Sequence, residues 1–160
     1  MLAKLILFSC IALLYGQDQV PKCGSAETEY APCVTKEKAD SLFQHCCKQY
    51  VPAECLDLCN YEADEEQARR LILQATTSGK CNLKYLSSIL YCASQNQDNK
   101  QCCQHLSLAD QQLGVGDRCL RFCDPAGEKG IKSIQKEDVS CLYNWNVIMY
   151  CHHSGIRSDE

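Results

Sequence analysis

The sequence predicts an all-α protein, a small disulfide-rich helical array. We expect an internally duplicated six-cysteine helical unit with an extra N-terminal cysteine pair. Three observations lead to this prediction. The chain has 15 cysteines among 160 residues, which is far above ordinary usage. One order of cysteine spacings occurs twice, and apolar residues recur at the three- and four-residue intervals of buried helix faces, with little strand-like alternation.

Residues 1–16 have the features of a secretory signal peptide. Lys4 supplies the positive charge, Leu5–Leu14 is apolar, and Gly16 is a small residue suited to the cleavage site. The apolar run is too short to span a bilayer, so a buried N-terminal helix is the alternative. Cleavage would remove Cys10 and leave 144 residues with 14 cysteines, an even number that can pair completely. Because disulfides persist in oxidising compartments, we expect a secreted, extracellular protein without a transmembrane segment in the mature chain.

The first half of the mature chain predicts three helices after a loop-rich extension, residues 17–41, that carries Cys23 and Cys33. Buried-face spacing indicates a helix from Ala39 to Tyr50. Asn60 is the expected N-cap of a second helix, which runs through an acidic first turn to Ser78 and stops at Gly79. Ion pairs Glu65–Arg69 and Glu66–Arg70 are expected on its solvated face. The third helix spans Leu83 to Ala93.

The second half predicts a similar course. Asp117 is the expected cap of a short helix around Cys119–Cys123, and Asp124–Gly127 is a loop. The last helix is marked by Val139, Leu142, Trp145, Ile148 and Met149 and closes at Gly155. Residues 156–160 are expected to form a flexible tail.

The cysteines repeat as a doublet, a Cys-x3-Cys pair and two single residues about ten apart. The repeat divides residues 42–155 into units of about 42–96 and 97–155. The expected disulfide cysteines, with pairing unknown, are Cys23, Cys33, Cys46, Cys47, Cys55, Cys59, Cys81, Cys92, Cys102, Cys103, Cys119, Cys123, Cys141 and Cys151. Fourteen cysteines allow on the order of 10⁵ pairings.

Helix geometry limits these pairings. Cys81 and Cys92 would lie about 16 Å apart on one helix, which is too far for a disulfide. Cys141 and Cys151 would likewise be too far apart to pair if one helix carries both. Adjacent cysteines point in different directions, so each doublet should reach two different neighbours. Each Cys-x3-Cys pair is expected to make a double link to one neighbouring helix. We expect both halves to use the same scheme.

Composition and motifs exclude several function classes. The net charge of −4 argues against nucleic-acid binding. Metal binding is disfavoured because no Cys-x2-Cys pair occurs, and no cofactor is expected. Catalytic residues are not expected: a phospholipase A2-like site would need Asp directly after its His, but Leu106 follows His105. His152 and His153 are expected as cations that complement the last helix turn, while His45 is expected on a partly exposed helix surface.

Several segments resemble the nematode DB module. They are Phe43–Cys47, Val51–Tyr61, Cys92–Ser94, Cys102–Cys103, Cys119–Cys123 and Cys141–Asn144. The similarity covers about residues 42–155 and includes the order of twelve cysteines. It implies a secreted or extracellular disulfide-bonded module, found alone or beside immunoglobulin-like domains, without an established molecular activity. Leu106–Gly116 departs from the family pattern as an inserted loop.

The sequence therefore favours a secreted, non-enzymatic module that binds an unknown extracellular protein. The loops Leu106–Gly116 and Asp124–Ile131 are the expected variable surfaces. The alternative is an extracellular carrier of a lipid or other small apolar ligand, with a pocket lined by Trp145, Met149 and Tyr150, although such a stripe is more often core. A phospholipase A2-like hydrolase is the third option.

Overall fold

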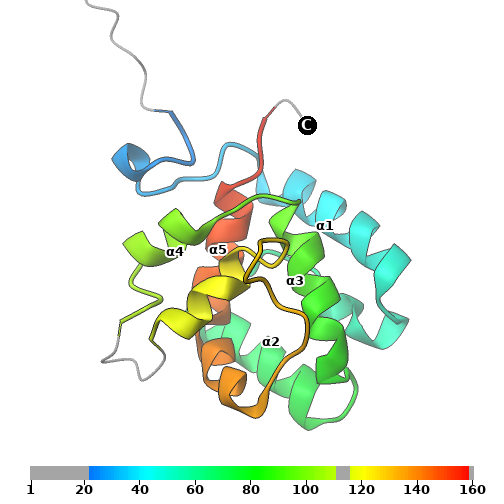
Figure 1. Ribbon diagram of the computed structural model, residues 1–160. Coiled ribbons are helices and arrows are strands. Elements are labelled where there is room, and N and C mark those ends of the chain that lie inside the picture. The colour runs from blue at the N-terminus through cyan, green and yellow to red at the C-terminus, as the bar shows by residue number, and fades with distance from the viewer. Residues whose placement is uncertain (1–21, 111–115, 159–160) are drawn as a thin grey trace, which may run out of the picture.

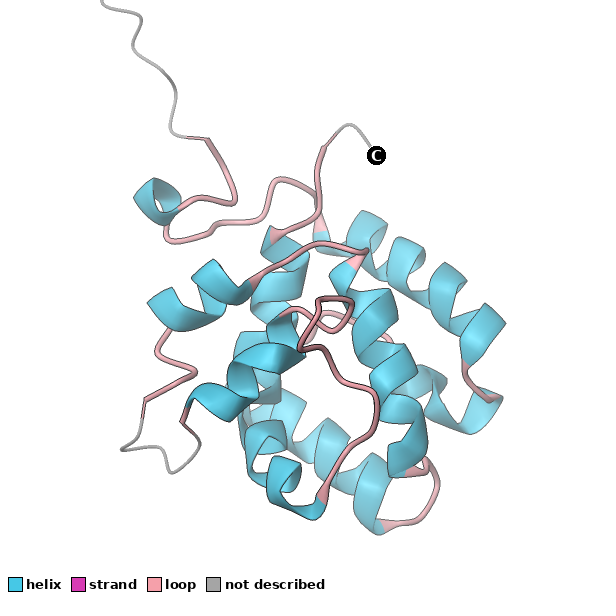
Figure 2. Cartoon of the chain, in the orientation of Figure 1, coloured by secondary structure: helices cyan, strands magenta, loops and turns pink. Residues whose placement is uncertain are grey.

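The computed structural model describes residues 22–110 and 116–158, and these residues form helices and loops without a strand (Figures 1 and 2). The N-terminal and first-half elements are η1 (Ala26–Thr28), α1 (Lys36–Tyr50), η2 (Ala53–Leu58), α2 (Glu65–Thr77), η3 (Leu83–Tyr85) and α3 (Leu86–Ser94). The second half contains α4 (Lys100–His105), η5 (Asp117–Cys123), η6 (Lys136–Asn144) and α5 (Trp145–Ser154). The predicted all-α, disulfide-rich fold is confirmed.

Side-chain caps fix where the two longest helices begin. The Thr35 side chain accepts a hydrogen bond from the Lys38 amide before α1, so the boundary predicted at residue 42 falls inside this helix. The Asp64 side chain accepts from the Gln67 amide at 2.9 Å and begins α2. The prediction that Asn60 caps this helix was wrong, because its amide instead donates to the Asp57 carbonyl at 2.7 Å.

The end of α2 and its charged surface follow the sequence pattern. The helix ends at Thr77, with Ser78 as the C-cap and Gly79 just beyond it. Glu65–Arg69 and Glu66–Arg70 form exposed ion pairs of 2.8 and 2.6 Å. The predicted cap of the short second-half helix was wrong, because Gly116 occupies the N-cap position and Asp117 is already inside η5.

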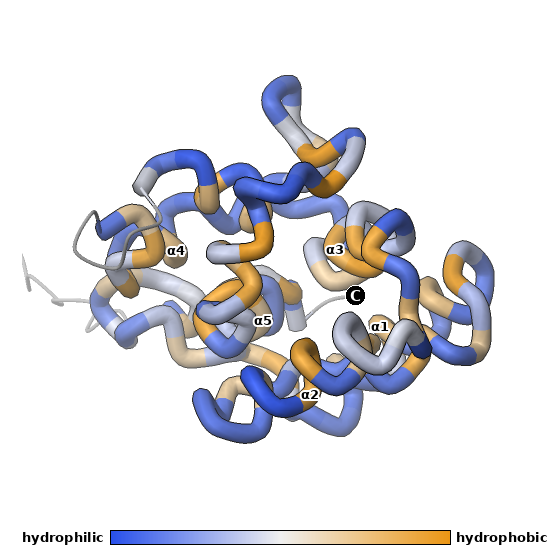
Figure 3. Tube along the Cα trace, turned by 90° about the horizontal axis from the view of Figure 1, so that it is seen from below, coloured by the Kyte–Doolittle hydropathy of each residue, from blue (hydrophilic) through white to orange (hydrophobic). Residues whose placement is uncertain are grey.

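Helix α5 lies at the centre of the molecule. It contacts α2, α3, α4, η5 and η6, and Figure 3 shows the hydrophobic stretch of α5 with other segments on several sides of it. Trp145, Ile148 and Met149 are fully buried. Trp145 and Met149 are therefore core residues, whereas Val139, expected on the same apolar face, remains 39% exposed.

Two segments expected at the surface are partly anchored. Leu108, in the inserted loop, is buried, while residues 111–115 lie outside the described residues. Ile156 is also buried, so the expected flexible tail begins with a core residue. The expected signal peptide, residues 1–16, lies outside the described residues as well. In the described part of the chain, every helix is too short or too polar to cross a membrane.

Candidate functional site

Within residues 22–110 and 116–158, fourteen cysteines form seven disulfides. The pairs are Cys23–Cys33, Cys46–Cys92, Cys47–Cys59, Cys55–Cys81, Cys102–Cys151, Cys103–Cys123 and Cys119–Cys141. In each half, the first cysteine of the doublet joins the last single cysteine, and the second joins the end of Cys-x3-Cys. The start of Cys-x3-Cys joins the first single cysteine. The predicted common scheme is therefore present in both halves.

The Cys-x3-Cys prediction was wrong. Cys55 and Cys59 join two different segments, because the intervening chain is the 3-10 helix η2 rather than an α-helix. With about three residues per turn, positions four apart in a 3-10 helix point about 120° apart. The same holds for Cys119 and Cys123 around η5. The prediction that the two cysteines of each doublet bond to different neighbours is confirmed.

The N-terminal extension folds over the second half of the chain. The Tyr150 hydroxyl donates to the Glu29 carbonyl at 3.0 Å, and the Glu29 carboxylate lies 2.9 Å from Nε2 of His105. Gly24, with φ of +70°, packs so closely on the end of α5 that a Cβ would lie 2.8 Å from the Ser154 carbonyl oxygen. The extension is therefore held by contacts to α4 and α5 as well as by the Cys23–Cys33 disulfide.

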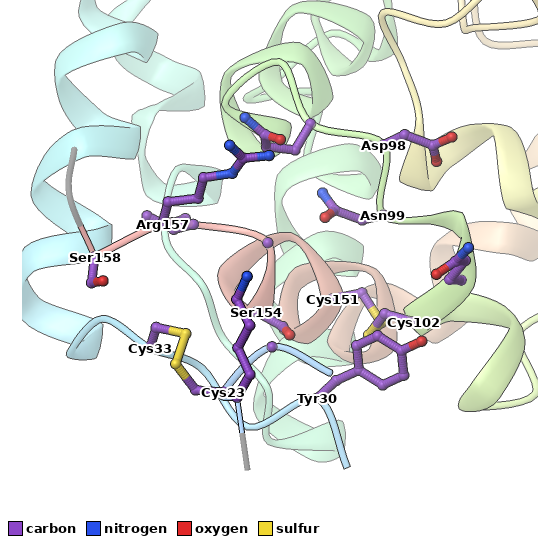
Figure 4. A pocket seen from close by; sticks show the side chains of 16 residues that line it. Cys23, Tyr30, Cys33, Asp98, Asn99, Cys102, Cys151, Ser154, Arg157 and Ser158 are labelled. Carbon is purple, nitrogen blue, oxygen red and sulfur yellow. A yellow bond between two sulfur atoms is a disulfide. The ribbon is translucent and has the colours of Figure 1, made fainter. Parts of the chain in front are cut away.

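A hollow of about 580 Å³ lies where this extension meets the end of α5 and residues 97–102. Figure 4 shows Arg157, Asn99 and Asp98 along one side, and Tyr30 and the Cys23–Cys33 disulfide along the other. Ser154 lies between them. The lining is mixed, with three charged side chains beside disulfides, Tyr30 and Ile156, and it differs from the predominantly apolar pocket of a lipid carrier.

Beside the hollow, a buried hydrogen-bonded chain crosses the second half. Nε2–H of His152 donates to the Phe122 carbonyl at 2.9 Å, which leaves Nδ1 to accept from the Asn99 amide at 2.9 Å. Burial lowers the pKa of His152 to about 4, because the charged imidazolium would lose its hydration. A Cβ on Gly155 would lie 2.0 Å from the Asn99 Oδ1, so a glycine is needed beside this side chain.

The prediction that His152 and His153 act as cations in the last helix turn was therefore wrong. His152 is buried and neutral, and burial also lowers the pKa of His153, whose Nε2–H donates to the Val34 carbonyl at 2.7 Å. The expected exposure of His45 is confirmed, and His105 is exposed as well. Burial outweighs the helix dipole at His152 because the loss of hydration is the larger effect.

A second surface feature lies between α2 and η6. Leu73, Val139 and Tyr143 are 37%, 39% and 49% exposed and line a small apolar groove together with Ile72 and Leu142. We call the three exposed residues the α2–η6 patch. Neither the patch nor the hollow was found from sequence, because each brings together residues from distant segments. Two cations, Lys22 and Arg157, line the hollow. They belong to no recognisable motif in the sequence.

The predicted loop Asp124–Ile131 is held on the surface of the second half. Lys100 Nζ lies 2.6 Å from the Asp124 carboxylate, and this hydrogen bond is the main reason that the pKa of Lys100 is raised. Gly130 N–H donates to the Gly127 carbonyl at 2.8 Å and closes the turn.

The fold and its cross-links define a small all-α module in which disulfides tie α1 to α3, and α4 to α5 and η5. The family model for the DB module matches residues 45–152, more than half of the chain, so the chain belongs to the DB module family. The resemblance inferred from sequence is thereby confirmed. No curated protein and no solved structure matches the chain. A DB module with many disulfides fits a small extracellular cysteine-rich domain.

Proposed function

We propose that this chain is secreted after removal of residues 1–16 and acts as a non-enzymatic module that binds another extracellular protein. The observation that carries the proposal is the α2–η6 patch. Its three large side chains stay exposed in a chain that has little apolar material, since Leu, Ile, Val and Phe make up only about a fifth of the mature residues. Apolar and aromatic side chains clustered on a rigid surface are typical of protein interaction sites.

The scaffold supports this role. The patch joins α2 of the first half to η6 of the second half, and Cys119–Cys141 fixes η6 to η5. Little conformational entropy would be lost when a partner binds a surface that is already ordered. Among the patch residues, Tyr143 should contribute most to the binding free energy, because tyrosine offers a wide contact area with few rotatable bonds.

The other functions have less support. A carrier would need an enclosed apolar pocket, whereas Trp145 and Met149 are fully buried core residues. For hydrolysis, His152 is the most buried histidine, and both of its ring nitrogens are already hydrogen-bonded. His105 is paired with Glu29 at the surface of the extension.

The test compares capture of a partner by three forms of the oxidised protein: wild type, the double variant Leu73→Ser/Tyr143→Ser, and the control Tyr50→Ser/Tyr91→Ser. The control removes two tyrosines that are as exposed but lie outside the patch. A protein cross-linked from extracellular fluid is then purified, and its affinity for each form is measured directly. We expect the patch variant to bind at least about tenfold more weakly, with the control unchanged. Equal affinity for all three forms would exclude the α2–η6 patch as the binding surface. Failure to recover any partner would count against the binding function itself.

A further inference from the structure

Two cations without ion-pair partners converge on the hollow. Lys22 comes from the N-terminal extension and Arg157 from the segment after α5, and neither forms an ion pair within residues 22–110 and 116–158. Asp98 is the third charged lining residue, and it shares the Lys100 ammonium with Asp124, so the two unpaired cations outnumber the one carboxylate of the lining. Lys100 Nζ lies 3.1 Å from one Asp98 oxygen, and the Lys100 amide donates to the other at 2.9 Å. The hollow therefore has a local positive charge in a protein with a net charge of −4.

The backbone next to each cation is anchored. The Ser25 hydroxyl donates to the Lys22 carbonyl at 2.6 Å, and the Cys23–Cys33 disulfide follows directly. Arg157 follows Ile156, which is only 1% exposed. Both cations lie outside residues 45–152, the part of the chain that the DB module family model matches.

Neutral polar groups complete the lining. Ser154 is 4% exposed and its Oγ has no hydrogen-bond partner, although buried hydroxyls normally have one. Figure 4 shows this side chain in the middle of the lining, between Arg157 and Tyr30. Asn99 and Ser158 add an amide and a second hydroxyl. Such groups recognise hydroxyls of a ligand, whereas the cations recognise an oxyanion.

We propose that this hollow binds a small hydroxyl-bearing organic anion, a sugar acid or a sugar or polyol phosphate. Arg157 and Lys22 bind the oxyanion, and Ser154 and Asn99 face the neutral part of the ligand. A volume of about 580 Å³ suits a molecule of this size. The site is separate from the α2–η6 patch and does not depend on the proposed protein-binding function.

The experiment titrates the oxidised, isotope-labelled protein with four probes and follows its amide resonances by NMR. Glucuronate and glycerol phosphate carry both an oxyanion and hydroxyls, acetate carries only the anion, and glucose carries only hydroxyls. We expect glucuronate or glycerol phosphate to shift the amides of Gly24, Asn99 and Gly155, and to bind at least about tenfold more tightly than acetate or glucose. The better of the two complete probes identifies the oxyanion.

Variants assign the binding to the two cations. Arg157→Gln and Lys22→Gln should each weaken binding of the better probe about tenfold, because each removes one charge-assisted hydrogen bond. Lys48→Gln, an exposed lysine on α1, is the matched control and should bind as wild type does. Neither Arg157→Gln nor Lys22→Gln removes an ion pair, so the unliganded spectrum of each should match that of the wild type. The proposal is overturned if no complete probe shifts these amides at millimolar concentration, or if both cation variants retain full affinity.

Discussion

The two halves of the molecule have the same disulfide frame and bury different side chains inside it. In the first half Cys46–Cys92 joins α1 to α3, and in the second Cys102–Cys151 joins α4 to α5, each with a Cα–Cα distance of 5.5 Å. The disulfides that join each doublet to Cys-x3-Cys are Cys47–Cys59 and Cys103–Cys123, with Cα–Cα distances of 6.5 and 6.6 Å. The three cross-links of each unit therefore join corresponding positions of the repeat.

Three matched positions show how the interiors differ. The residue three before the doublet, the residue before the second cysteine of Cys-x3-Cys and the residue after the last single cysteine are all buried in both halves. In the first half they are Phe43, Leu58 and Ala93, and in the second half Asn99, Phe122 and His152. At two of these positions an apolar side chain in the first half corresponds to a hydrogen-bonded polar side chain, Asn99 or His152, in the second. A covalent frame allows this change because the backbone does not depend on either interior alone.

The halves also differ after Cys-x3-Cys. The first half has α2 between Cys59 and Cys81, whereas the corresponding part of the second half has the loop Asp124–Gln135 followed by η6. As a result, α2 packs against α5 and η6 and links the two units. The repeat is therefore symmetrical in its disulfides and asymmetrical in its surface.

The largest expected effect tests the equivalence of the frames. Replacing Cys46 and Cys92 by alanine, or Cys102 and Cys151 by alanine, should lower the free energy of unfolding by about 4 kcal/mol in each case, because the sequence separations of 46 and 49 residues are nearly equal. Denaturant titration followed by circular dichroism measures both losses. A difference of more than about 1 kcal/mol would show that the two frames are not energetically equivalent.

The next effect concerns the polar interior of the second half. Between its unfolded pKa of 6.5 and its folded pKa of about 4, His152 binds a proton only when the chain is unfolded, so stability should fall as the pH falls through this range. Complete loss of this contribution corresponds to about 3 kcal/mol. Denaturant titrations at several pH values test it. In His152→Gln this part of the pH dependence should disappear, while His45→Gln, at an exposed position, should keep it. An unchanged profile in His152→Gln would contradict the assignment.

A smaller effect is expected at Gly155. Gly155→Ala should cost about 2 kcal/mol, because the new Cβ would meet the Asn99 side chain, which is buried and held by its hydrogen bond to His152. The matched control is Ser78→Ala at the C-cap of α2, which has the same right-handed backbone conformation as Gly155. Thermal unfolding of both variants measures the difference. Equal losses would mean that the polar interior does not require this glycine.

The smallest effect tests the element that only the first half has. Asp64→Ala should lower the free energy of unfolding by about 1 kcal/mol, because it removes the side-chain cap of α2. Asn60→Ala is the control and should cost less, since that side chain makes one exposed contact outside the helix. Denaturant titration separates the two. A larger loss for Asn60→Ala would restore Asn60 as the residue that positions α2.

The sequence by itself determined the all-α class, the duplicated cysteine order and the family. Each of these depends on local periodicity or spacing, as in the helical pattern that ends at Tyr50 and in the two doublets. It did not determine how Cys-x3-Cys connects, because α- and 3-10 helices of a few residues have the same apolar pattern but different rotation per residue.

Only the tertiary structure decided which distant residues meet. Lys22 and Arg157 line one hollow, and Leu73 and Tyr143 form one patch, because α5 and the disulfides bring chain segments together that no local pattern relates. The neutral state of His152 was decided in the same way. Burial in the folded second half lowers its pKa and outweighs the hydrogen bond to the Phe122 carbonyl, which acts in the opposite direction.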